Sequence, residues 1–255
     1  TKYGAVTSPN YLASVAGLEV LQKGGNAVDA AIAVASTMNV VYPQMTTLGG
    51  DNFWLIYNAK TKEVKALNAS GRAGELATID FYKKKGYDKI PSRGYLAANT
   101  VPGTVSGWDA AHKYARANMS NAGLPWKDLF DSAILYSQKG FPVTASLARW
   151  EEINVDPKDS EFRNLQRFSG FKQTYLKPDG SPYKVGEIMK LPQLANTYKL
   201  IAEKGANEFY RGSIAKKIVA DLQKHGGVLT LNDFAKHTAD WVEPLSVDYR
   251  GYKAY

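Results

Sequence analysis

The sequence predicts a layered fold that combines buried helices with an antiparallel β-hairpin. Residues 27–41 are almost all small or apolar, and a helix that is apolar all round is buried on every side. Residues 53–57 form the continuous apolar run FWLIY, which is typical of a strand covered on both faces. No repeat and no break in composition divides the 255 residues, so we expect a single domain spanning residues 1–255.

The N-terminal segment predicts two helices joined by a tight turn. Apolar residues recur on one face between positions 12 and 21, and Gly24-Gly25 provides the left-handed stop that ends such a helix. Asn26 can cap the next helix, with Asp29 three residues later at the acidic position of a capping box. Glycine and alanine carry no reactive group, so this segment indicates a fold rather than an active site.

The second helix, residues 27–41, should lie directly on the sheet. Its small side chains allow another element to approach closely. We therefore expect four of them to have almost no exposed area and to pack on the sheet that carries Trp54 and Ile56, namely Ala30, Ala31, Val34 and Ala35.

Strands follow the first two helices. Residues 53–57 and 63–69 predict a hairpin that turns at residues 58–62. A helix is expected from near Val105, and residues 124–138 show the clearest helical spacing in the chain.

The second half of the chain is less regular. The periodicity fades in residues 151–190, and residues 81–95 also have the composition of a loop. Helices are expected again at residues 194–204 and 213–225, each closed by glycine, and at the capping pair Thr230 and Asp233.

The C-terminal residues 243–255 alternate as a strand does. A strand with an unpaired edge is adhesive, so we expect the polypeptide to continue beyond residue 255. For the same reason residues 1–255 alone should be poorly soluble.

Composition excludes several classes of site. The absence of cysteine excludes a disulfide framework, a thiol nucleophile and thiolate metal ligands. No metal-ligand spacing and no cofactor motif is present, so we expect neither a metal nor a cofactor. The longest apolar run is too short for a membrane span and contains Asp29. No signal peptide is visible, and a cytoplasmic location is the default expectation.

The net charge of +8 raises the question of nucleic acid. The lysines are dispersed, the one sharp run is residues 83–85, and no nucleic-acid-binding motif is present. We interpret the charge as a solvated basic surface and expect neither a nucleic-acid nor a membrane partner.

No familiar catalytic signature marks this chain. A nucleophile elbow, a phosphate-binding loop and a zinc-protease motif are all absent. The histidines, His112, His225 and His237, lie near expected helix ends, so we expect surface or capping residues rather than bases. A Ser-His-Asp triad assembled from distant positions stays open.

Several ordered blocks resemble the γ-glutamyltranspeptidase-like family of N-terminal-nucleophile hydrolases. The first is KGGNAVDAA, and the others are NTVPGTVSGW, LPWKDLFDSAI with GFPV, LPQLANTYKLIAEKGANEFYRG, GGVLTLNDFAKH and EPLSVDYRGY. They cover nearly the whole chain, in the order found in the family. The resemblance identifies the chain as the large-subunit portion of such a protein.

The resemblance implies an α+β fold, a four-layer αββα sandwich completed by a small subunit cut from the same precursor. The nucleophile would be the N-terminal threonine of that small subunit, with its own α-amine as base. No catalytic residue is therefore expected in this chain. The implied reaction cleaves a γ-glutamyl or similar acyl amide of a small molecule and transfers the acyl group to water or an amino acceptor. Homo-oligomerisation stays open.

The resemblance also implies that the large subunit supplies an arginine for the substrate's α-carboxylate. The family's loop reads approximately R-E-x-A-P after the second hairpin strand, whereas this chain has NASGRAG at residues 68–74. Arg72 is shifted by about two positions, and Ser70 occupies the place of the arginine. Both are candidate substrate-binding residues, although Arg72 could equally form a structural ion pair. The departure favours a divergent branch, such as a cephalosporin or glutaryl acylase-like enzyme. A non-catalytic scaffold relative is the third alternative.

Overall fold

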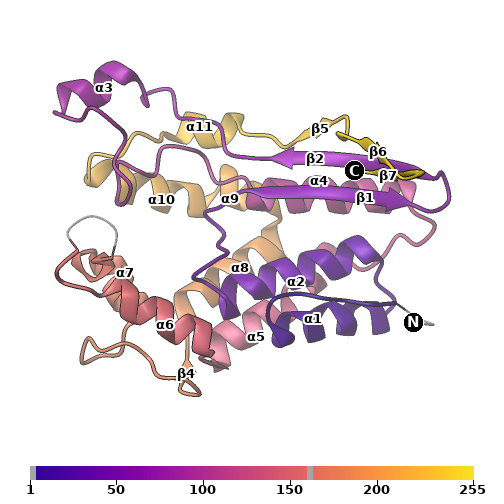
Figure 1. Ribbon diagram of the computed structural model, residues 1–255, viewed down its shortest axis with the longest axis horizontal. Helices are drawn as coiled ribbons and strands as arrows, with labels where there is room; N and C mark the ends of the chain where they lie inside the picture. Colours follow the sequence, from indigo (N-terminus) through magenta and orange to yellow (C-terminus); the bar gives the residue numbers. More distant parts are fainter. Residues whose placement is uncertain (1–3, 160–162) are drawn as a thin grey trace.

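The computed structural model describes residues 4–159 and 163–255, in which helices surround one side of a small antiparallel sheet (Figure 1). The helices are α1 Tyr11–Gln22, α2 Ala27–Val41, α3 Ile79–Lys84, α4 Thr104–Asn118, α5 Asp131–Lys139, α6 Ala145–Asn154, α7 Ser169–Tyr175, α8 Pro192–Lys204, α9 Ala206–Tyr210, α10 Ser213–Lys224 and α11 Leu231–Lys236. Two 3₁₀ turns, η1 Trp126–Phe130 and η2 Leu165–Arg167, join them. No helix among the described residues is long and apolar enough to span a bilayer.

The main sheet has the order β1-β2-β5, with strands Asn52–Asn58, Glu63–Ala69 and Asp240–Val242. The predicted hairpin is confirmed: β1 and β2 pair antiparallel, with Asn52 opposite Ala69. The remaining strands form two small hairpins, one of β3 Phe141–Pro142 with β4 Ile188–Met189, the other of β6 Val247–Tyr249 with β7 Tyr252–Ala254.

One face of the sheet is open in this chain. Helix α4 lies against β1 and β2 and buries Ile56 and Leu67. On β1 the alternate residues Phe53, Leu55 and Tyr57 are exposed. The described residues place a layer on one face alone, so the expected cover on both faces of this strand is not supplied by this part of the chain.

Helix α2 packs against other helices. Its main neighbours are α1, α5, η1 and α4, and it is α4 that covers the sheet. Ala30 is buried as expected, but Ala31, Val34 and Ala35 are half-buried. Val34 and Ala35 line a cavity of about 430 Å³, which Asn52 of β1 also lines. The prediction that α2 lies on the sheet with all four side chains buried is wrong.

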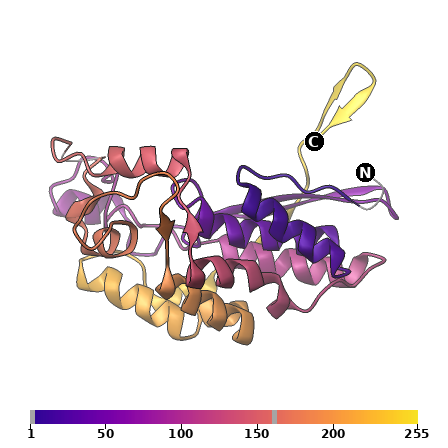
Figure 2. The same ribbon diagram turned by 90° about the horizontal axis from the view of Figure 1, so that it is seen from below.

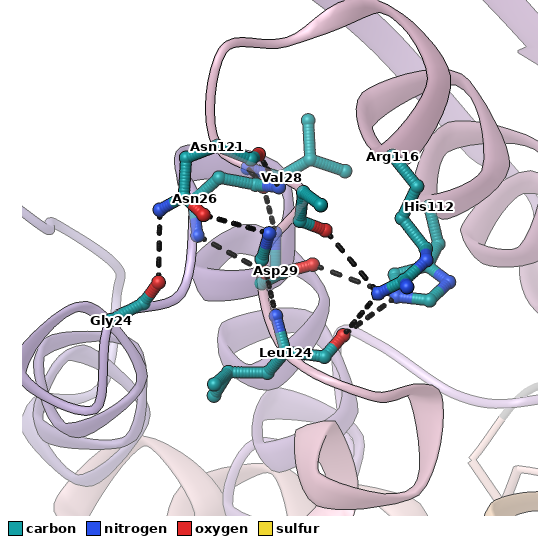
Figure 3. Close-up of polar contacts among 10 residues, drawn as sticks. Gly24, Asn26, Val28, Asp29, His112, Arg116, Asn121 and Leu124 are labelled. Carbon is teal, nitrogen blue, oxygen red and sulfur yellow. Dashed lines mark hydrogen bonds and ion pairs between the residues drawn. The ribbon is translucent and has the colours of Figure 1, made fainter.

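The start of α2 is fixed by the capping box that the sequence predicts (Figure 3). The side chain of Asn26 accepts from the N–H groups of Val28 and Asp29, and Asp29 accepts from the N–H of Asn26. The fully buried Asp29 Oδ2 also accepts from the N–H of Leu124 at 2.8 Å. His112 Nε2 lies 3.7 Å from the other oxygen of Asp29. One carboxylate thus joins α2 to α4 and to the loop that follows α4.

Three helices lie where the sequence indicated irregular structure. Helix α3 overlaps the start of the loop-like segment 81–95. Helix α7 lies inside residues 151–190, and the last turn of α6 extends into them. Their apolar faces are short, so local periodicity is weak. The expected helix at residues 124–138 begins as the 3₁₀ turn η1 and continues as α5.

The C-terminal residues form a hairpin rather than one long strand. Arg250 and Gly251 have positive φ values of 49° and 82° and make the turn between β6 and β7. Figure 2 shows this hairpin standing away from the rest of the chain. Its apolar residues Val247, Tyr249 and Tyr252 are all exposed.

Candidate substrate-binding loop

The predicted substrate-binding residues lie on the loop that leaves β2. Ser70 is half-buried, and its N–H donates to Asn68 Oδ1 at 2.9 Å. Arg72 follows two residues later with half of its side chain exposed. The structure therefore brings both candidates to one end of the sheet.

Two other segments hold this loop in place. The N–H of Gly71 donates to Asp51 Oδ1 at 2.8 Å, and the N–H of Val101 donates to the carbonyl of Arg72 at 2.9 Å. A Cβ on Gly71 would lie 2.0 Å from the carbonyl oxygen of Val101, so this close approach requires glycine. The carbonyl of Gly50 accepts from the N–H groups of Gly103 and Thr104, at the start of α4. Residues 49–51 and residues 101–104 thus meet at the loop that carries Arg72.

The guanidinium of Arg72 has two partners within the chain. Its Nη1 donates to the carbonyl of Thr238 at 2.7 Å, and its Nη2 pairs with Asp240 Oδ2 at 2.5 Å. Asp240 begins β5, opposite Asn68 of β2. The structural ion pair considered from sequence is therefore present. Because a guanidinium carries five N–H donors and this one is half exposed, it retains capacity for a further carboxylate.

A buried polar cluster lies behind Thr238. His237 Nε2 lies 3.0 Å from Ser106 Oγ, and Ser106 Oγ also lies 2.7 Å from the carbonyl of Gly103. The hydroxyl of Tyr210 accepts from the N–H of Ser106 and donates to the carbonyl of Pro102. These bonds connect α4, α9 and the segment that precedes β5. They thereby hold the carbonyl of Thr238, which accepts from Arg72.

Burial shifts the titration of this cluster. It lowers the pKa of His237, and the nearby charge of Arg72 lowers it further, so the imidazole is neutral at pH 7. Burial also raises the pKa of Tyr210 to about 12, against the opposing effect of its hydrogen bond with Ser106. Both side chains are therefore uncharged hydrogen-bonding groups.

The structure corrects the expectation for His112, which lies inside α4, and confirms the helix-end position of His237, which is the C-cap of α11. His112 and His237 are buried, at 6% and 4% exposure, because they bond groups on neighbouring elements. His225 is exposed at the end of α10, as expected. The sequence alone assigns no functional role to His237, Ser106, Tyr210 or Asp240, because the glycine, apolar and polar neighbours in the same blocks carry no signal that separates these four.

Ser106 and His237 form an incomplete catalytic pair. A triad needs a third group that orients the base, and His237 Nδ1 has no hydrogen-bond partner among the described residues. The serine hydroxyl is also bonded to its own helix turn. We interpret the pair as a support for the Arg72 loop.

A cavity of about 590 Å³ adjoins this support. It is lined by Ser106, His237 and Thr238, and by the ion pair of Asp109 with Lys113 on α4. The part of the chain that the structure describes contains no group of three or more metal-ligating side chains. What the site offers chemically is therefore positive charge and hydrogen-bond donors on a rigid loop.

This chain is similar to known proteins in sequence and in structure. The family model for gamma-glutamyltranspeptidase matches residues 13–255. The glutathione hydrolase-like YwrD proenzyme of Bacillus subtilis is 43% identical over 251 residues, which cover 98% of this chain and 45% of that protein. This chain thus spans less than half the length of that curated relative.

Two solved structures share the fold. The gamma-glutamyltranspeptidase of Helicobacter pylori has a TM-score of 0.87 and 32% identity, covering all of this chain and 69% of that one. The cephalosporin acylase of Bacillus halodurans has a TM-score of 0.85 and 36% identity, covering 98% of this chain and 44% of that one.

Proposed function

Since this chain belongs to the gamma-glutamyltranspeptidase family, we propose that the whole protein is an amide hydrolase or acyltransferase of that family. The carrying observation is the position of Arg72, at the end of β2 on a loop held by Asp51 and Val101. The α+β fold predicted from the sequence is confirmed by the match to solved structures.

In the proposed reaction the nucleophile lies on a small subunit cut from the same precursor. The hydroxyl of its N-terminal threonine attacks the amide carbonyl, and the threonine α-amine takes the hydroxyl proton. The amine of the substrate leaves with that proton, and an acyl-enzyme ester remains. Water or an amino acceptor then releases the acyl group. The name proenzyme of the B. subtilis relative supports a processed precursor.

We assign to this chain the binding of the substrate carboxylate. Arg72 would hold the carboxylate through N–H groups that Asp240 and Thr238 leave free, because a guanidinium can bind on more than one edge. Ser70, whose hydroxyl has no hydrogen-bond partner among the described residues, would donate a further bond.

An acylase acting on another side-chain amide is the second candidate. It is favoured by Ser70 standing at the family's arginine position and by the likeness to a cephalosporin acylase. A substrate whose acyl group lacks an α-amino acid carboxylate would depend less on a guanidinium at position 70.

One experiment separates the candidates. The full-length protein is purified, its chains are subjected to N-terminal sequencing, and γ-glutamyl, glutaryl and aspartyl anilides are compared as substrates. A second chain that begins with threonine and turnover of the γ-glutamyl anilide are the expected results. Preference for the glutaryl anilide would favour the acylase, and an unprocessed, inactive protein would favour a scaffold without catalysis.

A further inference from the structure

A larger cavity, of about 770 Å³, lies between α8, α10 and the segment of residues 97–102. Helix α9 packs against both α8 and α10 (Figure 1). The volume falls in the range of small-molecule sites, which are roughly 300–1,000 Å³. Ser70 and Arg72 do not line it, nor do the three side chains of the polar cluster, Ser106, Tyr210 and His237.

The floor of the cavity is apolar. Helix α8 contributes Leu194 and Leu200, and α10 contributes side chains four residues apart, Ile214, Ile218 and Leu222. Buried residues from other elements complete the floor, namely Leu48, Phe209 and Leu229. This surface suits an alkyl or aryl group.

The mouth of the cavity is polar and positively charged. Gln193, Asn196 and Lys217 are exposed, and none of these three side chains has a hydrogen bond or ion pair among the described residues. Lys217 is the sole charged residue among those that line the cavity, and no carboxylate accompanies it. This single lining cation makes the mouth complementary to an anion.

We propose that this cavity binds a small amphipathic carboxylate. The alkyl or aryl body occupies the floor between α8 and α10, and Lys217 pairs with the carboxylate at the mouth. Gln193 and Asn196 donate amide N–H groups to the same oxygens.

The site adjoins the substrate-binding loop without depending on it. Leu48 and Gly49 line one end of the cavity, and the next two residues, Gly50 and Asp51, bond the segments that hold Arg72. A ligand there contacts the support of that loop. Its binding requires neither turnover nor Arg72, so it is testable even if the proposed function fails.

The test is calorimetric titration of the full-length protein with octanoate and, as a neutral match, octan-1-ol. Octanoate should bind to one saturable site, and octanol about tenfold more weakly, since a charge-assisted contact is lost. Lys217→Gln should weaken octanoate binding about tenfold, whereas Lys216→Gln, which removes an exposed charge one position away, should leave it unchanged.

A filling variant tests the floor. Thr197 lines the cavity and is half-buried, and its hydroxyl bonds the carbonyl of Gln193 in its own helix. Thr197→Phe should abolish octanoate binding and leave the melting temperature unchanged. Absence of saturable binding by the wild-type protein would overturn the proposal, as would equal binding by Lys217→Gln. A third outcome is also decisive against the proposal. If the wild-type protein binds no octanoate and Thr197→Phe lowers the melting temperature, another part of the polypeptide fills the cavity.

Discussion

Arg72 is the residue on which the proposed function rests, and its geometry permits two roles. It pairs with Asp240 and Thr238 inside the chain, yet half of its side chain faces solvent. An exposed ion pair contributes only about 0–1 kcal/mol to stability. A role in holding substrate therefore predicts a much larger effect on activity than on folding.

Arg72→Ala in the full-length protein should weaken transition-state binding by about 2–4 kcal/mol, or roughly 30- to 900-fold in kcat/KM, through loss of a charge-assisted contact. Arg72→Lys should restore little, because an ammonium lacks the planar fork of donors. Steady-state kinetics with a carboxylate-bearing donor measures both.

Asp240→Asn is the matched control, since it breaks the same ion pair and keeps the guanidinium. Its kcat/KM should stay within a few-fold of wild type. If Arg72→Ala and Asp240→Asn have equal effects on melting temperature and neither changes kcat/KM, Arg72 is structural.

Glu151 is the second residue with a testable consequence. It is buried on α6 at 3% exposure, Oε2 accepts from the N–H of Tyr183, and Oε1 has no hydrogen-bond partner among the described residues. Burial raises the pKa of its carboxyl to about 7, against the opposing effect of the Tyr183 N–H. The native state therefore binds this proton more tightly than the unfolded chain does.

Stability should consequently fall as pH rises from about 4.5 to about 7, the window between the unfolded and folded pKa values. The contribution is about 1–3 kcal/mol, at roughly 1.4 kcal/mol per pKa unit with allowance for local relaxation. Glu151→Gln should make melting temperature less dependent on pH across this window, whereas Glu152→Gln, at the exposed neighbour, should not. Identical pH profiles of wild type and Glu151→Gln would contradict the prediction.

At the scale of elements, the junction of α2 and α4 depends on Asp29. Its Oδ2 accepts from the N–H groups of Asn26 and Leu124 with no exposed area. Gly123 must be glycine, since a Cβ there would lie 1.9 Å from the same oxygen and its φ is +74°. The capping box at α2 and the loop after α4 are therefore one unit.

Asp29→Ala should destabilise the fold by about 2–4 kcal/mol, because the N–H groups of Asn26 and Leu124 both lose their acceptor. Asn121→Ala removes two exposed hydrogen bonds in the same junction, from Asn121 Nδ2 to the carbonyl of Gly24 and from the N–H of Gly123 to Asn121 Oδ1, and should cost about 1 kcal/mol in total because both lie at the surface. Urea unfolding followed by tryptophan fluorescence compares them. Equal losses would show that Asp29 is not the joining group.

At the scale of the whole molecule, the open face of the sheet is the dominant feature. Phe53, Leu55 and Tyr57 are each more than half exposed, and the projecting β6–β7 hairpin adds Val247 and Tyr252. Apolar surface on this scale marks an interaction site. We propose that the rest of the full-length protein, including the small subunit, covers it.

Residues 1–255 expressed alone should accordingly be inactive and poorly soluble. In the full-length protein, Leu55→Glu should lower the yield of processed, assembled enzyme, whereas Ile79→Glu, at an apolar and even more exposed position at the start of α3, should not. Yield is measured by size-exclusion chromatography. Normal assembly of Leu55→Glu would show that this face is not an interface, and turnover by residues 1–255 would place the chemistry in this chain.

The sequence by itself determined the elements whose signals are local. The capping box of Asn26 and Asp29 lies within four residues of sequence, and the hairpin of β1 and β2 lies within residues 52–69. The ordered family blocks determined the fold and placed Ser70 and Arg72 on the loop after β2.

Only the tertiary structure decided which elements meet. The burial of His237 against Ser106 joins residues 131 positions apart, and the pairing of Arg72 with Asp240 joins residues 168 positions apart. It also placed α4, rather than α2, on the sheet. An apolar helix indicates that it is buried, but its composition does not say which neighbour covers it, because the hydrophobic effect is non-directional.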